Sequence, residues 1–130
     1  MLNGSCLCGT VRYEISARVR NLSNCHCTQC QKAHGAAFGT YAQADKRAFR
    51  FTSGEDMVSC YRSSKNVTRT FCGLCGSTLQ FIDGNTPYLN IAVGTLDDAI
   101  DEHVAEEIWC SEKASWLNPA AEIESHQKNR

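Results

Sequence analysis

The stretch RTFCGLCGSTLQFI, residues 69–82, decides how this chain is built, because a pair of cysteines stands between two segments rich in β-branched and aromatic residues. Alternation of apolar and polar residues after the pair predicts a β-strand, and Gly73 and Gly76 predict a tight hairpin tip. A thioredoxin-type C-x-x-C site would instead open a helix inside a βαβ unit. The stretch therefore predicts a zinc knuckle, in which Cys72 and Cys75 present two thiolates to a metal ion.

A second pair of cysteines, Cys6 and Cys8, lies near the N-terminus and is also flanked by glycines. A structural zinc ion takes four protein ligands, so the hairpin pair needs two more. Cys6 and Cys8 could instead be small buried residues, but that interpretation leaves Gly4 and Gly9 without a purpose. We expect one closed zinc site with four ligands, namely Cys6, Cys8, Cys72 and Cys75.

Three further cysteines, Cys25, Cys27 and Cys30, lie within the six residues CHCTQC. Such close spacing predicts one zinc ion with three protein ligands and an open position for water or substrate, which is typical of catalytic zinc. The alternative is that His26 or His34 supplies a fourth ligand and closes the site. An orienting role and a surface position are both open for His26.

The segments between the cysteines predict an all-β fold with mainly antiparallel sheets, short helical segments and stabilisation by zinc. They are short, rich in aromatic and β-branched residues, and separated by Gly, Ser, Asn or Asp. Helix is expected over 28–34 and, weakly, over 97–105. The expected strands are 10–17, 38–43, 48–52, 58–61, 67–71, 78–82, 88–93 and 106–110.

Composition limits the possible classes of protein. A chain of 130 residues that is 42% hydrophobic fits one domain, expected over 1–121, with a polar tail over 122–130. Its 13 basic and 14 acidic residues form no run of like charge, so we expect no binding to nucleic acid. No export signal or long apolar stretch is found, which predicts a cytoplasmic protein without a membrane anchor. Nine cysteines in a reducing compartment favour metal binding over disulfides.

The ordered motifs together resemble the glutathione-dependent formaldehyde-activating enzyme family, whose zinc fold is described as a β-tent. The resemblance rests on GSCLCG at 4–9, CHCTQCQK at 25–32, YRSS at 61–64, RTFCGLCGS at 69–77, GTLDD at 94–98 and KASW at 113–116. It implies two zinc ions per chain, a structural one on the four-cysteine set and a catalytic one on Cys25, Cys27 and Cys30. It also implies a carbon-sulfur lyase or synthase that joins a small aldehyde such as formaldehyde to the thiol of glutathione or a similar thiol.

The chain departs from the family at Glu107, where many members have histidine, and this change bears on substrate choice. Cys60 and Cys110 are expected to be buried, and Trp109 and Trp116 to belong to the core. Some cations near the motifs are candidates to attract the carboxylates of glutathione, namely Lys32, Arg62, Lys65, Arg69 and Lys113.

Two other functions compete with the lyase. A non-catalytic zinc module that binds a partner needs only the closed four-cysteine site, so the triplet argues against it. A methionine-sulfoxide-reductase-like enzyme would need a nucleophilic cysteine on a strand, for which Cys110 is the candidate. The sequence leaves the acceptor thiol, the electrophile and the oligomeric state open.

Overall fold

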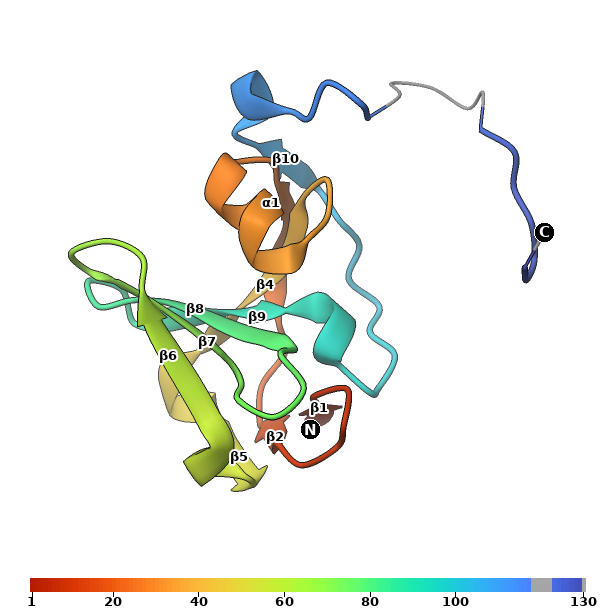
Figure 1. The fold of residues 1–130 in the computed structure, drawn as a ribbon. Coiled ribbons are helices and arrows are strands. Elements are labelled where there is room, and N and C mark those ends of the chain that lie inside the picture. Colours follow the sequence, from red (N-terminus) through yellow and green to blue (C-terminus); the bar gives the residue numbers. More distant parts are fainter. Residues whose placement is uncertain (118–122, 130) are drawn as a thin grey trace.

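The computed structural model describes residues 1–117 and 123–129, and these form a β protein with one short α-helix (Figure 1). The helix α1 (Thr28–His34) has the predicted bounds, and the all-β class is confirmed. Short 3-10 turns lie at Lys46–Ala48, Glu55–Met57, Val93–Thr95 and Cys110–Glu112. The strands are β1 (Leu2–Ser5), β2 (Arg12–Ile15), β3 (Arg20–Cys25), β4 (Gly39–Asp45), β5 (Phe49–Ser53), β6 (Val58–Arg62), β7 (Val67–Cys72), β8 (Thr78–Asp83), β9 (Tyr88–Ala92) and β10 (Glu106–Ile108).

The strands form two sheets. The smaller sheet has the order β1-β2-β5, and the larger has the order β10-β3-β4-β9-β8-β7-β6. Neighbouring strands are antiparallel, except that β10 runs parallel to β3. This parallel pairing sets Ile108 opposite Cys25, and so it brings the C-terminal part of the chain beside the cysteine triplet.

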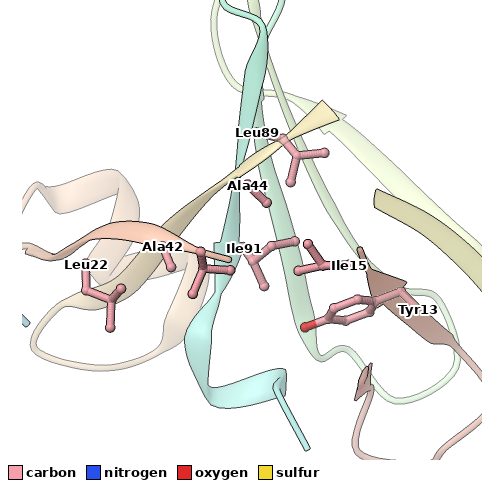
Figure 2. Packing of buried hydrophobic residues seen from close by; sticks show 8 residues of the cluster. Tyr13, Ile15, Leu22, Ala42, Ala44, Leu89 and Ile91 are labelled. Carbon is pink, nitrogen blue, oxygen red and sulfur yellow. The ribbon is translucent and has the colours of Figure 1, made fainter. Parts of the chain in front are cut away.

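Strand β4 has buried residues on both faces and lies between the main core and the residues around Cys25 and Cys30. Because side chains alternate along a strand, Ala42 and Ala44 point to one face and Tyr41 points to the other. The first face packs on the smaller sheet, and Figure 2 shows the side chains that meet there. They include Tyr13, Ile15, Leu22, Ala42, Ala44, Leu89 and Ile91. The second face, with Tyr41, packs against Cys25 and Cys30.

Close packing within the smaller sheet explains Gly4. The ring of Tyr13 lies so near this glycine that a β-carbon there would overlap the ring atoms. The Tyr13 hydroxyl is hydrogen-bonded to Thr95 Oγ1 at 2.7 Å, which fixes the ring in place. Gly4 is therefore required by packing in β1, whereas the sequence suggested a role in the neighbouring cysteine loop.

The expectations about secondary structure were wrong in two places. Residues 97–105 contain no helix, because this segment is held to β1 by side chains: Asp98 accepts the backbone N–H of Asn3 at 2.7 Å, and Asp97 accepts the Ser5 hydroxyl. Strands β1 and β3 were not expected at all. The predicted domain end at 121 falls in 118–122, outside the described residues.

Among the residues that the structure describes, we find no helix of the length and hydropathy needed to cross a lipid bilayer.

Candidate metal centres and the adjoining cavity

The four-cysteine cluster joins two loops that lie far apart in the sequence. Cys6 and Cys8 belong to the loop between β1 and β2, and Cys72 and Cys75 belong to the β7–β8 hairpin. The four sulfur atoms all lie within 4.8 Å of one another. The predicted four-cysteine set is therefore brought together in space by the fold.

The two loops have similar backbone turns. The N–H of Gly9 donates to the carbonyl of Cys6 at 3.0 Å, and the N–H of Gly76 donates to the carbonyl of Cys72 at 2.8 Å. Both glycines have positive φ, 78° and 81°, a conformation that costs energy with any side chain present. The loops also contact each other, because the N–H of Leu7 donates to the Ser77 hydroxyl at 2.8 Å.

The sulfur spacing fits a tetrahedral metal ion. With a metal–sulfur bond of about 2.3 Å, two sulfurs of a zinc tetrahedron lie about 3.8 Å apart. Cys6 Sγ and Cys8 Sγ are 3.5 Å apart, and Cys8 Sγ and Cys72 Sγ are 3.9 Å apart. This cluster therefore has the donors and the spacing to hold a metal ion.

The three-cysteine cluster is local in sequence and lies where β3 passes into α1. Cys25 ends β3, Cys27 caps the helix by accepting the N–H of Cys30 at 3.3 Å, and Cys30 is buried inside the first turn. The three sulfurs again lie within 4.8 Å of one another. Among the described residues no histidine nitrogen joins them, so the alternative of a closing His26 or His34 finds no support.

The segment that contains β10 and the turn after it lies near α1 (Figure 1), and hydrogen bonds join it to the loop that carries the three cysteines. The N–H of His26 donates to the carbonyl of Ile108 at 2.9 Å. Gln31 Nε2 donates both to the carbonyl of His26 at 2.7 Å and to that of Glu112 at 2.9 Å. The Glu112 carboxylate accepts the N–H of Thr28 at 3.0 Å. These bonds hold the cysteine loop in one conformation.

The most strongly shifted thiols of the two clusters have different acidities. Burial raises the pKa of the Cys30 thiol to about 12. Hydrogen bonds from Ser77 lower the pKa of the Cys75 thiol to about 5. A proton therefore competes with a metal ion more strongly at Cys30 than at Cys75.

A cavity of about 390 Å³ opens over the three-cysteine cluster, and all three of its cysteines line it. Its wall is one face of the larger sheet, because the register sets Tyr41 opposite Ser23, and Phe81 opposite both Arg69 and Asn90. Ile108 and Trp109 line it at the end of β10. The four-cysteine cluster lines none of the described cavities.

Arg69 is the cation that lines this cavity, and it is only 7% exposed. Both of its terminal nitrogens donate to Cys30 Sγ, at 3.8 and 3.7 Å. One of them also donates to the Tyr41 hydroxyl at 3.4 Å, and the guanidinium lies 5.0 Å from the centre of the Phe81 ring. The other candidate cations, Lys32, Arg62, Lys65 and Lys113, do not line the cavity.

Two pairs beside the triplet were not foreseen from the sequence. His26 is fully buried, and its Nε2 lies 2.9 Å from Glu107 Oε1. Its Nδ1 has no hydrogen-bond partner among the described residues. His34 Nε2 lies 2.8 Å from the Tyr41 hydroxyl. Burial and the charge of Arg69 lower the pKa of His34, which favours a neutral ring. The departure from the family at Glu107 was the one sequence signal of the first pair.

The expectation that the two remaining cysteines and the two tryptophans are buried was wrong. Cys60 is exposed because β6 is the last strand of the larger sheet, and Cys110 is exposed because it begins a surface 3-10 turn. Trp109 is 60% exposed at the rim of the cavity, and Trp116 is 67% exposed. These four residues therefore contribute little to the core.

The fold and the sulfur geometry define the class: a mainly antiparallel β protein with two candidate metal centres, of which one is closed and the other faces a cavity. The sequence model of the family described as glutathione-dependent formaldehyde-activating enzyme matches residues 1–112. The chain belongs to this family, and the resemblance noted from the motifs is confirmed.

Individual relatives agree with this membership. The chain is 32% identical to an uncharacterized lyase of Schizosaccharomyces pombe over 87 residues, which are 65% of this chain and 61% of the yeast protein. It is 28% identical to a Halomonas elongata protein whose name as a glutathione-dependent formaldehyde-activating enzyme is itself provisional, over 100% of this chain and 85% of that protein. A crystal structure of a Rhodobacter sphaeroides protein shares the fold, with a TM-score of 0.66, 20% identity and coverage of 81% of this chain and 98% of that one.

Proposed function

We propose that this chain is a zinc-dependent carbon-sulfur lyase that adds a small aldehyde such as formaldehyde to the thiol of glutathione or a similar thiol, or removes it. The observation that carries the proposal is the set of three sulfurs, from Cys25, Cys27 and Cys30, that line one cavity. Membership of the glutathione-dependent formaldehyde-activating enzyme family supports the substrate class. The names of the yeast and Halomonas relatives support the reaction type.

The donor sets support zinc as the metal in both clusters. Four thiolates are typical of a structural zinc ion, and three protein ligands beside a cavity are typical of a catalytic one. When bound at the triplet, zinc supplies Lewis acidity and favours the thiolate form of a substrate thiol, whose ordinary pKa is near 8.5. Cys6, Cys8, Cys72 and Cys75 are the proposed structural ligands, and Cys25, Cys27 and Cys30 are the proposed catalytic ligands.

The shape of the site supports a thiol with extended arms. A second cavity of about 440 Å³ shares Ser23, Phe81, Asn90 and Ile108 with the first, so the two cavities are neighbours along the larger sheet. A peptide-like thiol with its sulfur at the triplet has room to extend toward the second cavity. The aldehyde then meets the thiol in one orientation, and positioning of two reactants is the main contribution that we assign to the protein.

The proposed reaction balances without an oxidant or a reductant. The sulfur electron pair of the bound thiolate forms a bond to the carbonyl carbon, the C=O π pair moves to oxygen, and that oxygen takes up a proton from solvent, which balances the proton that the thiol released to solvent on binding. The product is an S-hydroxymethyl thiol, and the reverse direction breaks the same carbon-sulfur bond.

The test is to follow S-hydroxymethylglutathione formation by NMR with zinc-loaded protein. We expect Cys27→Ser to reduce turnover by at least about 100-fold, because the loss of one ligand removes the metal or misplaces it. Cys60→Ser is the matched control, since Cys60 is exposed on β6, and it should retain full turnover. Full turnover in Cys27→Ser would contradict the assignment. No turnover in the wild type with any thiol tested would favour the non-catalytic module, and loss confined to Cys110→Ala would favour the reductase-like enzyme.

A further inference from the structure

The charge of Arg69 needs an explanation of its own. A buried guanidinium without a counter-charge costs several kcal/mol. Arg69 forms no ion pair with a carboxylate among the described residues. Its polar contacts are Cys30 Sγ, the Tyr41 hydroxyl and the Ser63 hydroxyl, which accepts from Nε at 3.2 Å. The acceptor among these that carries a negative charge once a metal ion is bound is the sulfur of Cys30.

The charge count of the triplet matches this cation. A divalent ion with three thiolates carries one net negative charge, and Arg69 carries one positive charge at every physiological pH. The loaded site and Arg69 are then neutral together. A thiolate that entered the cavity as a further ligand would bring a second negative charge into a partly buried site, and its entry is less costly when Arg69 is present.

The side chain is held in a way that suits this role. The Phe81 ring lies under the guanidinium, and the Ser63 hydroxyl holds Nε. Both terminal nitrogens are thereby directed at the one sulfur of Cys30. A planar guanidinium has two parallel donors for such a contact, which a lysine ammonium lacks. The charge therefore stays on the cavity side of the sheet, next to the metal ligand.

We propose that Arg69 is a positioning residue that selects an anionic sulfur ligand for the cavity, by supplying the fixed positive charge that offsets the three-thiolate site. The proposal rests on the function proposed above and deepens it, because it names the charge state that the site accepts: a thiolate in preference to a neutral donor. The proton that the substrate thiol loses on binding goes to solvent.

The test uses cobalt-loaded protein, in which ligand binding is read from the absorption spectrum without any turnover. Glutathione and imidazole are titrated separately, as an anionic and a neutral ligand. We expect Arg69→Met to weaken glutathione binding about tenfold or more, which is about 1.4 kcal/mol, and to change imidazole binding less than about twofold. Arg62→Met is the matched control, because it removes an exposed arginine from the adjacent strand β6, and it should bind both ligands like the wild type.

Each other outcome has a defined meaning. Equal weakening of glutathione and imidazole in Arg69→Met would overturn the proposal, since a distorted site loses both. Unchanged glutathione binding would overturn it as well. Arg69→Lys covers the case in which the methionine variant does not fold or does not hold cobalt, because it keeps the positive charge. A tenfold loss of affinity for glutathione in Arg69→Lys, with the affinity for imidazole unchanged, would contradict a role for charge. If glutathione leaves the wild-type spectrum unchanged, the proposed function fails and not merely this inference.

Discussion

The two cysteine clusters have similar ligands, but they differ in how far apart those ligands lie in the sequence. The four-cysteine cluster joins loops whose cysteines are separated by 64 residues, and it faces no described cavity. The three-cysteine cluster lies within one short stretch of sequence and lines a cavity of about 390 Å³. Ligands that are distant in sequence cross-link the fold, because a metal between them closes a long loop. Ligands that are close in sequence add little cross-linking, which leaves them available for chemistry.

The largest expected effect is on the stability of the fold. Cys72→Ser removes one of four ligands from the cross-linking cluster, and a structural zinc ion contributes on the order of 10 kcal/mol to folding. We expect the variant to be largely unfolded in thermal denaturation followed by circular dichroism. Cys60→Ser, also on the β6–β7 hairpin, should melt like the wild type. A Cys72→Ser protein with an unchanged melting temperature would show that the cluster does not cross-link the fold.

The next largest effect is expected on removal of metal, which should distinguish the two clusters by their rates of release. A site with three protein ligands and a cavity is more accessible to a chelator than a closed site with four, so we expect two metal ions per chain with unequal rates of release. The first ion should leave with little change in circular dichroism, and the second should leave together with the sheets. Metal analysis after timed chelation measures both steps. If the protein never contains more than one metal ion per chain, the three-cysteine cluster does not bind a metal ion in solution.

Acid should release the two ions in the same order. Metal binding displaces protons from thiols, so a site loses its metal as the pH falls, and it does so at higher pH where the thiol pKa is higher. Burial raises the pKa of Cys30, whereas hydrogen bonds from Ser77 lower that of Cys75. We expect the triplet to lose its ion at the higher pH. Simultaneous release in a stepwise pH titration with a metal-sensitive dye would contradict this difference.

The smallest expected effect concerns the contact between the two loops of the four-cysteine cluster. Ser77→Ala removes the acceptor for the N–H of Leu7 and a partner of Cys75 Sγ, which we expect to cost about 1–2 kcal/mol of folding stability. The exposed Ser111 provides the control, Ser111→Ala, beside the other cluster. Denaturant unfolding measures the difference. A larger loss in Ser111→Ala than in Ser77→Ala would reverse the roles assigned to the two regions.

The parts of this molecule that were predictable from sequence are those encoded over short distances. The hairpin at Cys72 and Cys75, the helix over 28–34 and the grouping of Cys25, Cys27 and Cys30 depend on neighbours in the chain. Family membership followed from the same motifs. The pairing of the distant cysteine pairs was predictable because a closed site needs four ligands.

The parts that were missed depend on contacts between distant residues. Strand β3 is largely polar, with only Leu22 and Cys25 buried, so its sequence lacks the strand pattern. Trp109 was expected in the core because it is large and apolar, but the parallel pairing of β10 carries it to the rim of the cavity. The contact of Arg69 with Cys30 spans 39 residues and depends on strand register, which no local pattern encodes.

The parallel pairing of β10 with β3 has a consequence for the order in which the protein is completed during its synthesis. The ligands of the four-cysteine cluster have all been translated once Cys75 has been added, and those of the triplet long before. The cavity wall still lacks Ile108, Trp109 and Glu112, which come later in the sequence. Since domains are made from the N-terminus onward, both sets of sulfur ligands precede the cavity on the ribosome. The nascent protein thus has all seven candidate metal-ligating cysteines before the wall of the cavity is complete.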